Sequence, residues 1–112
     1  MHELGITQSI VDACSVAAGD ATVTSVTVEI GCLCGVLPQA VRFCYDVCAQ
    51  GTVLEGSRLD IVSVPGRGRC RDCAAEMNIE DFLALCACGS TDIELCGGDE
   101  LRIMTMEIER CA

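Results

Sequence analysis

Four cysteines in two close pairs constrain the fold of this chain more than any other feature. Cys70 and Cys73 are separated by two residues, Cys86 and Cys88 by one, and twelve residues lie between the pairs. This spacing is close to that of a structural zinc site, in which two short turns direct four thiolates toward one tetrahedral ion. Because the segment 70–98 has too little periodic apolar sequence to bury a core of its own, we expect its folding to depend on the metal.

The second cysteine pair departs from the usual spacing, since one residue rather than two separates its members. Leu85 stands where the first cysteine of a longer pair would be, which makes Cys86 the less secure ligand and Cys96 an alternative. A site of four thiolates has no open coordination position, so it predicts a structural ion and not a catalytic one. Taken pair by pair, the same residues also fit buried free thiols or a redox-active Cys-x-x-Cys.

The complete set of eleven cysteines in 112 residues fits reduced thiols better than disulfides. An odd number leaves one cysteine unpaired, and the chain opens with Met1-His2-Glu3 instead of the basic and apolar segments of a secretory signal. We therefore expect a cytoplasmic protein whose other cysteines pack as small apolar side chains or stay free. Cys32 and Cys34, on a turn between glycines, are candidates for an additional soft-metal site.

Outside the cysteine-rich segment, apolar residues follow helical or strand periodicity over five stretches. Helical spacing predicts two helices, over 4–18 and 38–49. Alternation of apolar and polar residues predicts three strands, over 23–30, 58–64 and 101–109. Since 51% of the chain is apolar but only 3% is aromatic, the core is expected to be aliphatic.

The order of these stretches predicts an α+β fold: a three-stranded sheet with two helices, plus an inserted small zinc-ribbon-like domain. Pro65-Gly66-Arg67-Gly68 resembles a hinge between the second strand and the cysteine-rich segment. We accordingly predict that residues 1–64 and 99–112 form one α/β domain and that residues 65–98 form a zinc-binding domain.

The charge of the chain argues against several classes of function. The chain has seventeen acidic residues, seven arginines and no lysine, which gives a net charge of −10. Such a chain repels phosphate backbones and anionic lipids, and a zinc-ribbon nucleic-acid module would need a basic face with aromatic residues. No stretch approaches the length of a transmembrane helix. A single histidine and the lack of a nucleophile motif disfavour a hydrolase, and no helix evidently follows a cysteine pair to activate a thiol. We expect no enzyme.

His2, the only histidine, supports two interpretations. The first is a frayed and solvated chain terminus. The second is a chelate, in which the α-amine of a retained Met1 joins the amide nitrogen and imidazole Nδ1 of His2 in fused rings on one metal ion. Glu3 adds a fourth donor through its amide or its carboxylate. Nitrogen donors of this kind suit square-planar Ni(II) or Cu(II), and a shallow, pH-dependent site suits transfer of the metal.

Together these motifs resemble the HypA/HybF family of hydrogenase nickel-incorporation proteins. The similarity spans the whole chain. Each motif is weak alone, but their order in a chain of this length is specific to the family. Its motifs are Met1-His2-Glu3, Val28-Glu29-Ile30-Gly31, the Glu55–Leu59 segment, the pairs Cys70/Cys73 and Cys86/Cys88-Gly89-Ser90, and the closing Glu100–Glu109 stretch.

The resemblance implies a nickel metallochaperone that loads the [NiFe] centre of a hydrogenase large subunit together with a HypB-type GTPase. It implies nickel on Met1, His2 and Glu3 as transferred cargo, and structural zinc on Cys70, Cys73, Cys86 and Cys88. Some members of the family also serve urease maturation. We further expect a monomer or weak homodimer. The alternative function is a zinc-ribbon protein-interaction module without metal delivery.

Overall fold

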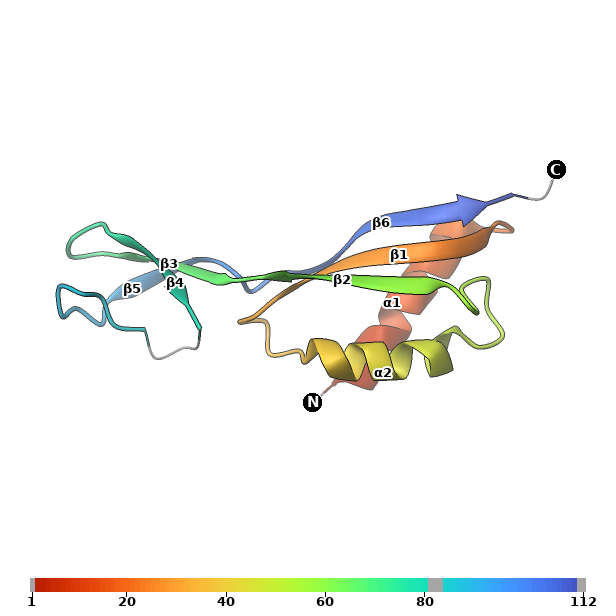
Figure 1. Ribbon diagram of the computed structural model, residues 1–112, viewed down its shortest axis with the longest axis horizontal. Coiled ribbons are helices and arrows are strands. Elements are labelled where there is room, and N and C mark those ends of the chain that lie inside the picture. The colour runs from red at the N-terminus through yellow and green to blue at the C-terminus, as the bar shows by residue number, and fades with distance from the viewer. Residues whose placement is uncertain (1, 81–83, 111–112) are drawn as a thin grey trace.

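The computed structural model describes residues 2–80 and 84–110 and extends over 60 × 27 × 17 Å. Figure 1 shows two sheets, placed one after the other along the long axis, with both helices beside the larger sheet. The α+β fold class predicted from the sequence is confirmed. The proposed division into domains 1–64 with 99–112, and 65–98, stays a prediction; below, residues 65–98 are called the cysteine module. None of the described helices is long and apolar enough to span a membrane.

The larger sheet has the strand order β2-β1-β6, with β1 parallel to β2 and antiparallel to β6. Helices α1 and α2 cover one of its faces (Figure 1). Val26, Val28 and Ile30 of β1 point into this core and are almost completely buried. The elements are α1 (Glu3–Ala18), β1 (Thr22–Gly31), α2 (Pro38–Ala49), β2 (Arg58–Val64) and β6 (Leu101–Glu109), within one residue of the predicted bounds.

Three short strands form the second sheet, in the order β4-β3-β5, with β3 antiparallel to both neighbours. They are β3 (Gly66–Cys70), β4 (Glu76–Ile79) and β5 (Ile93–Gly97). The sequence analysis did not predict these strands. Along β3, the buried positions are Gly66, Gly68 and Cys70, and the exposed ones are arginines. Because glycine has no side chain, an alternation of glycine with arginine does not register as an apolar pattern.

Three glycines bring the two sheets into close backbone contact. A Cβ atom on Gly31 would collide with the backbone of Gly98, and one on Gly98 would collide with Gly66. The amide of Gly31 donates to the carbonyl of Glu100 at 2.7 Å. Only Pro65 separates β2 from β3, so the sheets are joined by continuing strands rather than by a long linker.

We expect Gly98→Ala to destabilise the protein much more than Gly56→Ala. Both glycines have positive φ, +94° and +78°, so both substitutions introduce left-handed strain of about 1 kcal/mol. Only at Gly98 does the new methyl group also overlap neighbouring backbone, which adds about 1–3 kcal/mol. Urea unfolding of both variants measures the difference in free energy of unfolding. Equal losses would contradict the close approach at Gly98.

Candidate metal centre

The four predicted zinc ligands lie together at one end of the molecule. Their sulfur atoms are all within 4.8 Å of one another, and no second group of this kind occurs among residues 2–80 and 84–110. The Sγ–Sγ distances are 3.7 Å for Cys70–Cys88 and 3.5 Å for Cys73–Cys86. Four sulfurs bound to zinc at about 2.3 Å would be separated by about 3.8 Å. The arrangement therefore fits a tetrahedral thiolate site.

Cys86 completes this group, and the alternative Cys96 does not. Cys86 is 5% exposed and its sulfur faces that of Cys73. Cys96 is exposed on β5, and its thiol donates to the carbonyl of Glu94 at 3.6 Å.

Two tight turns hold the cysteine pairs, and the second turn is one residue shorter. In the first, the amide of Cys70 donates to the carbonyl of Ala75, and in the second the amide of Cys86 donates to that of Ser90. The residue after the second cysteine of each pair has positive φ: +64° for Ala74 and +93° for Gly89. A turn shortened by one residue matches the shorter spacing of Cys86 and Cys88.

Backbone amides near the sulfurs favour thiolate ligands. The backbone N–H of Cys73 is the main cause that lowers the pKa of the Cys70 thiol to about 6, against the opposing effect of burial. The N–H of Ser90 acts in the same direction on Cys88, but the neighbouring Cys86 and Cys70 sulfurs raise its pKa to about 12. Without a cation, the four sulfurs therefore do not all ionise near neutral pH. A divalent ion would remove that obstacle.

Two ion pairs of Arg71 lie at the edge of the module, next to the first turn. Arg71 bonds to Asp92 at 2.8 Å and lies 3.7 Å from a carboxylate oxygen of Glu94. Asp92 raises the pKa of Arg71. Because these groups are half exposed, the pairs stabilise the module only slightly. Their effect is to fix the first turn beside the start of β5.

Of the predicted nickel ligands, His2 and Glu3 lie at the start of α1. Met1 lies outside the described residues. His2 is exposed and precedes the helix, and its carbonyl accepts the amide of Ile6 at 2.9 Å. Glu3 is 8% exposed, and its carboxylate accepts the backbone N–H of Leu37 at 3.2 Å. The sequence analysis missed this contact, because it joins residues 34 positions apart.

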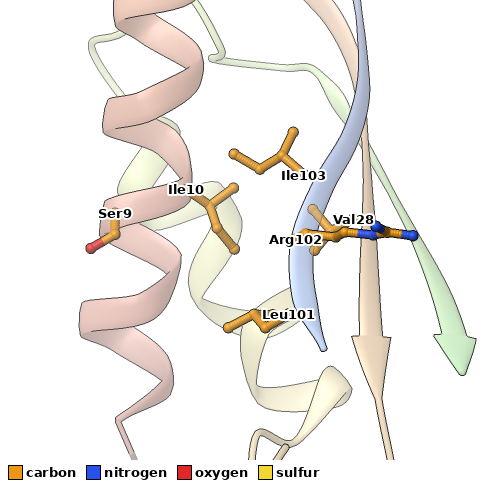
Figure 2. Close-up of a pocket in the computed structure, with 6 residues that line it drawn as sticks. All are labelled: Ser9, Ile10, Val28, Leu101, Arg102 and Ile103. Atoms are coloured by element: carbon orange, nitrogen blue, oxygen red, sulfur yellow. The ribbon is translucent and has the colours of Figure 1, made fainter. Parts of the chain in front are cut away.

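A separate hollow of about 220 Å³ lies between α1 and β6. Figure 2 shows Ile10, Leu101 and Ile103 directed into it. The guanidinium of Arg102 points away from the hollow (Figure 2) and is bound to Glu29 at 2.9 Å. The mainly apolar lining gives it no ligand set for a metal ion.

Comparison with known proteins places these features in one family. Residues 1–108 match the family model described as HypA: hydrogenase/urease nickel incorporation, metallochaperone. A hydrogenase maturation factor HypA of Nostoc punctiforme is 49% identical over 109 residues, covering 97% of this chain and 96% of the relative. The corresponding factor of Geobacter metallireducens is 46% identical over 110 residues, covering 97% and 100%.

The fold agrees with a solved structure as well. The solution structure of the Ni metallochaperone HypA from Helicobacter pylori matches with a TM-score of 0.65 at 22% identity, covering 96% of this chain and 97% of that one. The family is one of metallochaperones, which confirms the expectation that the chain is not an enzyme. Because the family model matches nearly the full length of the chain, the chain belongs to the HypA family of hydrogenase/urease nickel-incorporation metallochaperones.

Proposed function

We propose that this chain binds Ni(II) at Met1, His2 and Glu3 and delivers it to the [NiFe] hydrogenase large subunit in the cytoplasm, with structural zinc at Cys70, Cys73, Cys86 and Cys88. The single observation that carries the zinc assignment is the group of four sulfurs with near-tetrahedral spacing. The nickel assignment is supported by the family description and by the donors at the chain start.

The residues at the chain start suit nickel because they offer nitrogen donors at a solvent-exposed point. His2 is exposed at the start of α1. The Glu3 carboxylate already accepts the amide of Leu37, which favours the backbone nitrogen of Glu3 over its carboxylate as the further donor. Amine, amide and imidazole nitrogens give the tetragonal field that Ni(II) prefers.

The two proposed sites serve different purposes because their coordination differs. Four thiolates leave zinc with no open position, so that ion holds the cysteine module together and is not exchanged for a substrate. A site of nitrogen donors that must lose protons on binding releases nickel when those protons return. The chain then keeps one metal and transfers the other.

The proposed partners are a HypB-type GTPase and the hydrogenase large subunit. The relatives are named hydrogenase maturation factors, which favours hydrogenase over urease as the process served. The net charge of −10 disfavours contacts with nucleic acid or anionic membranes. We propose a monomer or weak homodimer as the working state. The second candidate function, a zinc-ribbon interaction module without metal delivery, rests on the cysteine cluster alone.

His2→Ala is expected to abolish binding of the single nickel ion, because it removes the imidazole from the chelate. Native mass spectrometry of untagged protein with one equivalent of Ni(II) measures this directly. An N-terminal extension should have the same effect, since it converts the α-amine to an amide. Gln8→Ala changes an exposed residue of α1, the helix that follows His2; this variant is the control and should bind nickel normally. Nickel retained at one equivalent by His2→Ala would show the assignment of His2 as a nickel ligand to be wrong.

Cys73→Ser is expected to lose zinc and to unfold the cysteine module, because about 10–16 kcal/mol of metal binding is the folding energy of modules of this kind. Zinc content by native mass spectrometry and amide exchange over 66–97 report the two losses separately. Cys96→Ala changes an exposed cysteine of the same module outside the cluster and should keep one zinc. Stoichiometric zinc in Cys73→Ser would show the four-thiolate assignment to be wrong.

A further inference from the structure

The segment Cys32–Leu37, here called the neck loop, joins β1 to α2 and contacts the cysteine module. At its start, Cys32 Sγ accepts the backbone N–H of Gly66 at 2.9 Å and lies 3.6 Å from the carbonyl oxygen of Ile79. The amide of Leu33 donates to the carbonyl of Gly98 at 2.7 Å. Two consecutive loop residues therefore hold β3, the end of β4 and the residue that follows β5.

Side-chain packing reinforces these hydrogen bonds. Leu33 is 5% exposed, and its side chain lies so close to Gly66 that a Cβ atom there would overlap it. The amide of Cys32 also donates to the carbonyl of Val64 at 2.9 Å, just before the chain enters the module. The direction of the module relative to the larger sheet is thus set by contacts across the junction as well as by the connecting strands.

The other end of the neck loop reaches the proposed nickel ligands. The backbone N–H of Leu37 donates to Glu3 Oε2 at 3.2 Å. Leu37 immediately precedes α2, and Figure 1 shows the start of that helix beside the start of α1. One loop of six residues therefore contacts the cysteine module at one end and Glu3 at the other.

We propose that the neck loop couples the orientation of the cysteine module to the N-terminal residues, with Cys32 as the positioning residue. The sulfur of Cys32 accepts a hydrogen bond from the backbone N–H of Gly66 in the module. Substitution of Cys32 by alanine removes the sulfur and leaves that N–H to water or to no partner. The fastening of the module by Cys32 stands independently of the metals. The effect on nickel rests on the proposed function.

Amide exchange and residual dipolar couplings of the full chain, loaded with one equivalent of Zn(II), test the fastening. In Cys32→Ala, we expect exchange at Gly66 to rise about fivefold, as for loss of one hydrogen bond, and the alignment tensors fitted to the two sheets to differ more than in wild type. Cys32→Ser keeps an acceptor and should restore most of the protection. Cys96→Ala, a module cysteine away from the neck, is the matched control and should match wild type. Unchanged Gly66 exchange and an unchanged difference between the two tensors in Cys32→Ala would overturn the fastening.

Nickel titration of the same variants tests the coupling. Cys32→Ala with full zinc content should show faster exchange at Leu37 and bind nickel about threefold more weakly than wild type and Cys96→Ala, less than the loss of a full hydrogen bond. Unchanged nickel affinity beside altered Gly66 exchange would overturn the coupling. Absence of His2-dependent nickel in wild type would overturn the proposed function instead, while the exchange at Gly66 and Leu37 would still decide the inference about the loop.

Discussion

Four cysteine sulfurs within 4.8 Å of one another are the constraint on which the far end of this molecule depends. Their mutual proximity raises the pKa of Cys88 to about 12 even though the amide of Ser90 favours its thiolate, while backbone amides lower that of Cys70 to about 6. A cluster with such opposed tendencies is stable as four thiolates only around a cation. The strand β3 adds little apolar side-chain burial to the surrounding sheet, because two of its three buried positions are glycines.

The same glycines explain how the module joins the larger sheet. β2 and β6 flank β1 on opposite sides, and beyond Gly31 their continuations β3 and β5 pair directly with each other. That convergence brings Gly31, Gly66 and Gly98 so close that none has room for a side chain. The neck loop leaves β1 at this point, which is why its first residues meet the module. The junction is therefore a packed contact, and the segment Pro65-Gly66-Arg67-Gly68, expected to be a hinge, consists of the residue that joins β2 to β3 and the first three residues of β3.

The elements with a local apolar periodicity could be predicted from the sequence. Features that depend on contacts between residues distant in the chain, or on turn geometry, could not. The two helices and the strands of the larger sheet follow from apolar repeats, as Val26, Val28 and Ile30 illustrate. β3 was missed because its buried positions carry glycine, with Ile79 and Ile93 filling the space over Gly68. The choice between Cys86 and Cys96 required the turn geometry, in which Gly89 at a φ of +93° closes a shorter loop. The contact of Glu3 with Leu37 has no sequence signal, since it joins residues far apart in the chain.

On the proposed function, Glu3 serves to position the residue before it. A carboxylate that accepts the Leu37 amide holds the first turn of α1 against the start of α2, so His2 extends from a fixed base. Chelation of a transferred ion needs such a base, because a wholly frayed terminus would lose conformational entropy on closing the ring. It also needs the donors to stay exposed, and His2 is exposed. A first turn held by this contact and an exposed His2 meet both requirements, and the contact joins Glu3 to the last residue of the neck loop.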